Sequence, residues 1–271
     1  MLTMLFVCVL LFFLGAAIGS FLNVVVYRTL SGESWKVGRS HCEHCNHTIT
    51  WYENIPLLSF VMLGGRCSVC KKPIDITHPV VEVLMGSLFV WWYLVGSLFF
   101  QLSQNPFQVV QPLFWLCVGV VLCLIVVIDM QHYIIPDVLS ALLLVLALCY
   151  RTALTAAGIM QPTDYIQLAL AALVGSGFLF ILWHATRGKG IGFGDVKLMV
   201  PLALLVGWPQ VVALLFVAFV SGAVVGVLLM VCGKKTMKYA VPFGPFLIAG
   251  AVFSLQWGDT LLGWYLSQLG M

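Results

Sequence analysis

Four of the nine cysteines stand in two closely spaced pairs. Cys42 and Cys45 are separated by two residues, Cys67 and Cys70 are spaced in the same way, and 21 residues lie between the pairs. Each Cys-x2-Cys turn presents two thiolates to one ion, so two such turns predict a tetrahedral zinc site. Four thiolates fill every coordination position, so we expect the zinc ion to be structural. A pair of disulfides is one alternative. Another is that a neighbouring histidine replaces one ligand; these are His41, His44 and His47.

Two aspartates stand at the ends of apolar segments. Asp129 closes the run 120–128, and Asp195 lies between Gly194 and the start of another apolar run. An ionisable group at the edge of the hydrocarbon is costly, which marks it as a candidate functional residue. Two carboxylates brought together there would share one proton, as aspartyl proteolysis requires: one activates water and the other protonates the leaving amine. Gly192 and Gly194 would allow close approach of backbone and substrate.

Structural roles for such acids compete with the catalytic one. Interfacial aspartates also cap helices, and Asp137, which follows Pro136, is typical of a helix cap. Lys197 either tunes Asp195 or extends its ammonium group to the membrane surface, and the second role is the commoner. The chain contains no HExxH, no GxSxG elbow and no phosphate-binding glycine loop.

The composition shows which solvent surrounds these residues. Of 271 residues, 62% are hydrophobic and 8% are charged. A soluble fold has roughly a quarter of its residues charged, so most of this chain must lie in lipid. The net charge of +3 is too small to indicate nucleic-acid binding. We therefore expect an all-α polytopic membrane protein with membrane lipid as its surroundings.

Eight apolar segments are candidate membrane spans. They are Leu2–Tyr27, Val80–Leu102, Leu113–Ile128, Val138–Tyr150, Ile166–Trp183, Leu198–Val206, Val211–Cys232 and Val241–Leu255. The sixth is too short for a straight span, and is either lengthened by its flanks or re-entrant with the following segment. The expected organisation is a first transmembrane helix (1–27), a zinc-binding domain (28–79) and a transmembrane domain of about seven segments (80–271).

The basic residues predict the orientation. Three loops, 28–78, 185–197 and 233–239, hold 12 of the 13 lysines and arginines, and Arg151 is the remaining one. If eight segments cross, these three loops share one side, which the positive-inside rule makes cytoplasmic. No lysine or arginine precedes Arg28, so the first segment is predicted to be a retained helix with its N-terminus outside. The cysteine loop then faces a reducing compartment, which disfavours disulfides.

The motifs, taken in order, resemble those of the type IV prepilin peptidases, membrane aspartyl proteases that process pilins and type II secretion pseudopilins. The matching pieces are Gly19–Arg28, the two cysteine pairs with Trp51–Ser59 between them, Pro79–Glu82, Asp129 with Pro136-Asp137, and Gly192–Leu198. They extend over roughly residues 15–200. No such motif marks the C-terminal spans.

This resemblance implies a function in the bacterial inner membrane. Asp129 and Asp195 would be the catalytic pair, whereas Asp137 matches a family position outside that pair. The substrates would be prepilins and pseudopilins, cut on the cytoplasmic side by removal of a basic leader. Glu33, Glu43 and Glu53 either attract that leader or are ordinary solvated loop charges, and the second role is the commoner. The four cysteines accompany a second activity in the family, N-methylation of the new N-terminal residue with S-adenosylmethionine as methyl donor.

The sequence does not reveal where the methyl donor binds. Resemblance ties Glu82 and Gly86 to methyl transfer weakly, and no dinucleotide-type glycine loop is visible. Three other readings remain open: a peptidase without methylation, an ion-coupled membrane transporter with a regulatory zinc loop, and a structural scaffold. The transporter would need ionisable groups spread along a path near the midplane, whereas here the acids cluster at one edge. The oligomeric state is not predicted.

Overall fold

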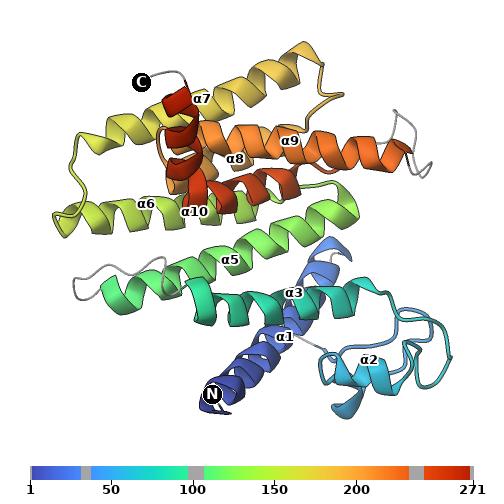
Figure 1. Cartoon of the computed structure of the whole chain (residues 1–271). Helices are drawn as coiled ribbons and strands as arrows, with labels where there is room; N and C mark the ends of the chain where they lie inside the picture. Colours follow the sequence, from blue (N-terminus) through green and yellow to red (C-terminus); the bar gives the residue numbers. More distant parts are fainter. Residues whose placement is uncertain (1, 32–37, 97–106, 232–240, 269–271) are drawn as a thin grey trace. The chain divides into compact units, whose positions relative to one another are not determined.

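The structure, a computed structural model of the chain, describes residues 2–31, 38–96, 107–231 and 241–268. Within these ranges every regular element is a helix, and extended pairing is confined to two isolated bridges, His41–Thr48 and Arg66–Pro73. The elements are α1 (Leu2–Ser31), η1 (Tyr52–Asn54), α2 (Leu58–Met62), α3 (Thr77–Trp91), η2 (Trp92–Gly96), α5 (Phe107–His132), α6 (Asp137–Ala156), α7 (Asp164–Ala185), α8 (Phe193–Val206), α9 (Gln210–Val231) and α10 (Gly244–Gln268) (Figure 1).

Seven helices of the described residues are long and apolar enough to cross a membrane, which confirms a polytopic all-α fold. They fall within α1, α3 with η2, α5, α6, α7, α9 and α10. Helices are the expected solution for such sequences, because a bilayer offers no water to the backbone and each helix satisfies its own N–H and C=O groups. The eighth segment, α8, has 14 residues and spans about 21 Å, less than the hydrocarbon thickness of about 30 Å.

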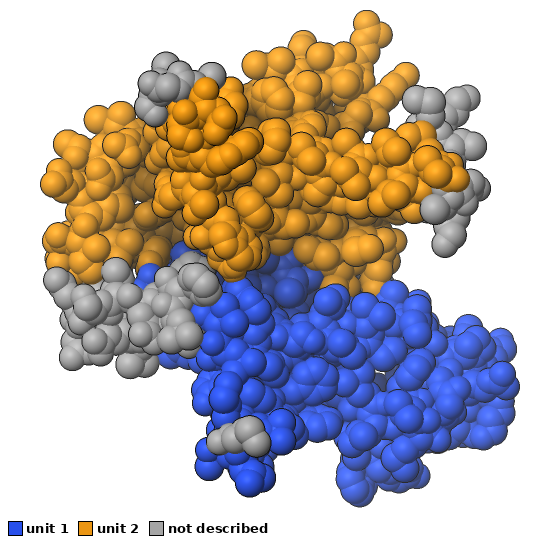
Figure 2. Space-filling model, viewed as in Figure 1, with its two compact units in different colours: residues 1–124 blue, residues 125–271 orange. Residues whose placement is uncertain are grey.

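The chain forms two compact units, residues 1–124 and 125–271 (Figure 2). The first unit contains α1, the cysteine loop, α3 and most of α5. The second contains the end of α5 and the helices α6 to α10. The cysteine loop and the two aspartates therefore belong to different units. The functional division at residues 27 and 79 stays a prediction.

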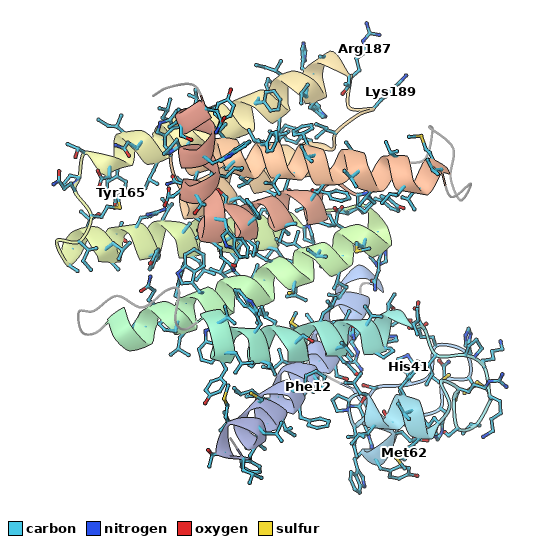
Figure 3. The ribbon with its side chains drawn as sticks, in the orientation of Figure 1. Phe12, His41, Met62, Tyr165, Arg187 and Lys189 are labelled. Carbon is cyan, nitrogen blue, oxygen red and sulfur yellow. The ribbon has the colours of Figure 1, made fainter. Side chains whose placement is uncertain are left out.

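In the first unit, α1 and α3 cross at glycines. A Cβ added to Gly15 would lie 2.5 Å from the carbonyl oxygen of Met85, and one added to Gly19 would lie 3.0 Å from that of Val81. Gly86 faces α1 in return, because its added Cβ would lie 2.8 Å from the Phe12 ring. Figure 3 labels Phe12 on α1. Small residues spaced by four let backbones approach closely in lipid. The contacts of Gly86 are therefore those of a packing residue.

In the second unit, α8 is the central helix. It packs against α6, α7, α9 and α10, and Leu198, Met199 and Leu202 on it have no exposed surface. The helix begins at Phe193, five residues before the predicted apolar run, because the segment from Phe193 to Lys197 forms its first turn. The flanking residues thus lengthen this segment at its N-terminal side.

Arg151 of α6 caps the C-terminal end of α8. Its Nε donates a hydrogen bond to the carbonyl of Leu204 (3.0 Å), and its Nη2 donates one to that of Leu205 (2.9 Å). The last carbonyls of a helix have no partner within the helix, and apolar surroundings supply none. A cation at a helix C-terminus is also favoured by the helix dipole. The single basic residue outside the three basic loops is therefore a helix cap.

We expect Arg151→Met to lower the free energy of unfolding by about 2–4 kcal/mol, because it leaves two partly buried carbonyls at the end of α8 unsatisfied. Denaturant unfolding in detergent measures this loss. Arg187→Met is the matched control, since Arg187 is exposed on the turn after α7 and extends away from the helices (Figure 3). The control should change stability by no more than about 0.5 kcal/mol. Equal stabilities of the two variants would contradict the capping role.

Candidate functional site

The four predicted cysteines come together in the first unit. The Sγ atoms of Cys42, Cys45, Cys67 and Cys70 all lie within 4.8 Å of one another, and the Cys42–Cys70 and Cys45–Cys67 pairs are each 3.9 Å apart. A tetrahedral zinc–sulfur site with bonds of about 2.3 Å has sulfur atoms about 3.8 Å apart. The quartet therefore fits a zinc ion. The group consists of cysteines alone, which gives no support to a histidine ligand.

The two cysteine pairs stand on two turns of the same design. The N–H of Cys42 donates to the carbonyl of His47, and the N–H of Cys67 donates to that of Lys72, each at 2.9 Å. Asn46 and Lys71, directly after each pair, both have positive φ, at 55° and 57°. Outside the cysteines the two turns share an isoleucine, Ile49 and Ile74, which stands seven residues after the first cysteine of each pair.

The second turn also favours the thiolate form that binds a metal. The N–H groups of Cys70 and Val69 lower the pKa of the Cys67 thiol to about 6. A turn that donates backbone N–H groups to the sulfur stabilises the thiolate before a metal ion binds. Figure 3 labels His41 on this loop, next to the first pair.

Side chains of the predicted motif attach this loop to the helices. The Glu82 carboxylate of α3 accepts a hydrogen bond from the N–H of Leu57 (2.8 Å), which holds Leu57 at a φ of +61°. Nδ2 of Asn23 donates to the carbonyl of His78 (3.2 Å) and so joins α1 to α3. Nη2 of Arg28 donates to the carbonyls of Gly38 (3.3 Å) and Arg39 (2.9 Å).

A cavity of about 210 Å³ lies between this loop and the ends of α1 and α3. Glu53 forms part of its wall, and its side chain is only 8% exposed. Hydrogen bonds from the Ser68 side chain and from the N–H and hydroxyl of Thr50 lower the pKa of Glu53 to about 2. Glu53 is therefore a fixed negative charge rather than a solvated one. Glu82 also lines the cavity, whereas Gly86 does not.

Asp195 lies in the first turn of α8, in the second unit, and is 6% exposed. Its Oδ2 accepts a hydrogen bond from the N–H of Gly192 (3.1 Å), and its own N–H donates to the carbonyl of Gly192 (3.2 Å). This reciprocal pair caps the helix and fixes the carboxylate. The other oxygen, Oδ1, is buried without a hydrogen-bond partner in the described residues. A buried carboxyl oxygen left unpaired is costly and indicates a functional role.

Asp129 lies near the end of α5 and is 5% exposed. Its Oδ2 accepts a hydrogen bond of 3.0 Å from the N–H of Gly244, the first residue of α10. A Cβ added to Gly244 would lie 2.6 Å from that same oxygen, so no larger residue fits without movement. Sequence reasoning missed Gly244. The signal was a glycine between prolines, Pro242-Phe243-Gly244-Pro245, which marks a turn with close backbone approach.

The structure brings the two aspartates together around Ile135. Added Cβ atoms at Gly244 and Gly194 would lie 3.3 Å from Cδ1 and 3.2 Å from Cβ of Ile135, respectively. Gly244 touches Asp129, and Gly194 directly precedes Asp195. Asp129 and Asp195 are therefore connected to the same isoleucine through the glycines beside them. Two buried carboxyl groups that meet at such a place would favour a state that holds one proton between them.

Asp137 does not cap α6 as the sequence predicted. Pro136 occupies the cap position and the Asp137 side chain makes no capping hydrogen bond. Its two oxygens instead accept hydrogen bonds from Nζ of Lys197 at 2.8 and 2.9 Å. Lys197 therefore pairs with Asp137, which explains its position without any role at Asp195. The pair is largely exposed and links the starts of α6 and α8.

Two family descriptions match consecutive parts of the chain. The bacterial peptidase A24 N-terminal domain matches residues 13–95, and the type IV leader peptidase family matches residues 115–227. A prepilin leader peptidase/N-methyltransferase of Burkholderia pseudomallei is 34% identical to the chain, over 90% of this chain and 84% of that protein. The chain belongs to the type IV leader peptidase family.

Further relatives carry the same name. The prepilin leader peptidase/N-methyltransferase of Aeromonas hydrophila is 31% identical over 96% of this chain and 93% of its own length, and that of Legionella pneumophila is 29% identical over 92% and 91%. No solved structure matches the chain significantly.

The two matched ranges relate directly to the two sites. The N-terminal domain match contains all four cysteines and Glu82, and the leader peptidase match contains Asp129 and Asp195. Gly244 lies beyond both matches. Its link to the candidate site comes from its hydrogen bond to Asp129 alone.

Proposed function

We propose that this chain is a bacterial inner-membrane prepilin leader peptidase that also N-methylates the new N-terminal residue. The observation that carries the peptidase part is the pair of buried aspartates, each fixed by a backbone N–H at a helix start. A pair held in this way can share one proton without help from a metal or a nucleophilic side chain. Family membership and the names of the relatives support the same reaction.

The reaction follows from the proton shared by the two acids. The ionised carboxylate takes a proton from water as the water oxygen attacks the scissile carbonyl. The protonated carboxyl donates a hydrogen bond to that carbonyl and then gives its proton to the leaving amine. Asp195, whose Oδ1 has no partner in the described residues, has an oxygen available for the water or the substrate.

We propose the cytoplasmic edge of the bilayer as the place of this reaction. The turn before α8 carries Arg187 and Lys189, and Figure 3 shows Tyr165 at the opposite end of α7 from these two basic side chains. Asp195 lies six residues after Lys189, so it belongs to the basic side of the second unit. Basic loops stay in the cytoplasm by the positive-inside rule. The N-terminus would then lie outside.

The proposed substrate has a basic leader followed by an apolar helix. A site at the membrane edge would let the helix stay in lipid while the leader remains in water. Of the three acids suggested for the leader, Glu43 has a side chain 47% exposed, Glu53 is engaged within the loop, and Glu33 lies outside the described residues. Glu43 is therefore the described acid best placed to attract basic residues.

For methylation, the cysteine loop would hold zinc through its four thiolates, and S-adenosylmethionine would supply the methyl group. The zinc site has no open position, so its role would be to fold the loop. Loop residues with little core of their own depend on such a staple. The loop then places the polar wall of the cavity against the ends of α1 and α3.

The decisive experiment is reconstitution of the purified chain in lipid with a prepilin and S-adenosylmethionine. We expect a gel shift from leader removal, and a mature N-terminus that mass spectrometry shows to carry one added methyl group. Cleavage without methylation would support the peptidase-only reading. If neither product forms and the liposomes instead show ion flux, the transporter reading would replace this proposal.

We expect Cys42→Ser to abolish methylation while leaving cleavage within about threefold of wild type, because zinc folds the loop and the aspartates lie in the other compact unit. Bound zinc, measured by elemental analysis, should be lost in parallel. Cys149→Ser is the matched control, since Cys149 on α6 is outside the cluster. If both activities survive without zinc, the metal loop has no part in either reaction.

A further inference from the structure

The cavity of the first unit contains a buried carboxylate with little to balance it. Glu82 is 8% exposed, and its one hydrogen bond within the described residues comes from the N–H of Leu57. No salt bridge joins it to any described residue. A buried carboxylate without a cation is strongly unfavourable, so such a group is expected to receive one from a ligand.

The surroundings of Glu82 are also negative. Two lysine or arginine side chains, four histidines and four carboxylates line the cavity: Arg28, Lys72, His41, His44, His47, His78, Glu43, Glu53, Asp75 and Glu82. His47 lies 3.7 Å from Glu53 and His78 lies 3.9 Å from Glu43, whereas Glu82 is buried and has no such partner among the described residues. Arg28 is already engaged with the carbonyls of Gly38 and Arg39. Four thiolates around one zinc ion add a further net negative charge to the loop, and two of these cysteines touch the cavity. The cavity therefore selects a positively charged ligand.

The remaining walls suit a ligand with a flat, apolar part. Tyr27 of α1 and Phe60 of α2 line the cavity, and aromatic rings of this kind stack on purines. The volume of about 210 Å³ is below that of most small-molecule sites, about 300–1,000 Å³. A nucleoside-sized ligand would fill the cavity and reach its mouth, where Asn54 is exposed.

We propose that this cavity binds S-adenosylmethionine, with the Glu82 carboxylate against the positive charge of the methyl donor. The inference rests on the proposed function, because it assigns a binding place to the methylation reaction. The assignment gives Glu82 a charge role in addition to its hydrogen bond to Leu57, and leaves Gly86 as a packing residue of the α1–α3 crossing.

The charge of Glu82 also suits the transfer itself. The neutral α-amino nitrogen of the substrate forms a bond to the methyl carbon as the carbon–sulfur bond breaks. The electron pair of that bond stays on sulfur as a neutral thioether, and the nitrogen, now positive, releases a proton to water. Because positive charge passes from sulfur to nitrogen, a fixed carboxylate stabilises it on both sides of the transfer.

The test measures equilibrium binding of S-adenosylmethionine to the full-length protein in detergent by calorimetry, without any prepilin. We expect Glu82→Gln to weaken binding about tenfold or more, the effect of losing one charge-assisted contact. Glutamine keeps an oxygen for the N–H of Leu57, so the loop should remain folded, with unchanged zinc content and thermal stability. Prepilin cleavage should also stay within about threefold of wild type.

A second variant blocks the site by volume instead of charge. Asn54→Trp at the cavity mouth should abolish binding of S-adenosylmethionine and leave zinc bound. Asp164→Asn, an acid on α7 in the other unit, is the matched charge control and should bind normally. A parallel titration with S-adenosylhomocysteine, which lacks the sulfonium charge, identifies the partner of Glu82. If Glu82→Gln weakens binding of S-adenosylmethionine alone, Glu82 faces the sulfonium. If it weakens binding of both compounds equally, Glu82 faces their ammonium group.

Two results would overturn the assignment of the cavity. Only the second of them would also contradict the proposed methyltransferase activity. If the wild type binds S-adenosylmethionine and methylates its product, but Glu82→Gln and Asn54→Trp bind as tightly as the wild type, the donor binds elsewhere and the proposed methyltransferase stands. If the wild type neither binds the donor nor methylates a cleaved prepilin, the methylation part of the proposed function is lost together with the cavity assignment.

Discussion

Replacement of Asp195 by asparagine is expected to reduce prepilin cleavage by about 10³-fold or more. Asparagine keeps an oxygen that accepts the hydrogen bond from the N–H of Gly192. The first turn of α8 should therefore stay intact. Asparagine cannot exchange a proton with water or with the leaving amine. Asp129→Asn should cause a loss of the same order, because its amide can still accept from Gly244 but cannot share the proton.

The measurement is the rate of leader removal by purified variants in lipid, with unfolding followed in parallel. The double variant should be no more defective than either single variant, because two acids that share one proton act as a unit. Asp137→Asn is the matched control. It breaks an exposed ion pair with Lys197, which is worth about 0–1 kcal/mol, so cleavage should fall at most about fivefold. Cleavage retained by Asp129→Asn and Asp195→Asn would remove the two-aspartate mechanism.

The sequence predicts best those features that depend on short spacing. The cysteine pairs form their quartet because each turn fixes two thiolates locally, and one long-range contact between the turns then completes the site. The helical class follows from composition, since lipid permits little else. Helix ends were less predictable. The apolar run Leu113–Ile128 lies within a longer helix, Phe107–His132, because polar residues such as Gln111 and His132 continue the helix.

Long-range partners could not be predicted from residue types. Asp137 resembles a helix cap in sequence, but Lys197, 60 residues later, binds its carboxylate instead. Arg151 resembles a loop charge, but it caps a helix that ends 55 residues further on. In each case the partner is supplied by a segment more than 50 residues away, and the local preference of about 1 kcal/mol carries no information about it. The same reason hides the contact between Asp129 and Gly244, 115 residues apart.

The hydrogen bond from Gly244 to Asp129 leads to the second large predicted effect. We expect Gly244→Ala to lower kcat for leader removal about 100-fold. The new Cβ would lie 2.6 Å from Oδ2 of Asp129, whereas ordinary contacts begin at 3.4 Å. The carboxylate must therefore move by most of an ångström, and a misplacement of about 1 Å costs about 100-fold in rate. Gly244 would act as a positioning residue, since it holds Asp129 and does not itself exchange protons.

Gly263→Ala on the same helix is the matched control, because its added Cβ meets nothing within 4 Å. Kinetics with a prepilin separate positioning from a general structural defect. A positioning role predicts a fall in kcat with KM within about threefold of wild type, because only the transition state needs the displaced carboxylate. It also predicts normal methylation of a substrate whose leader has already been removed, since the cysteine loop lies in the other compact unit. A variant that loses both activities in proportion to its folded fraction would show that Gly244 serves packing alone.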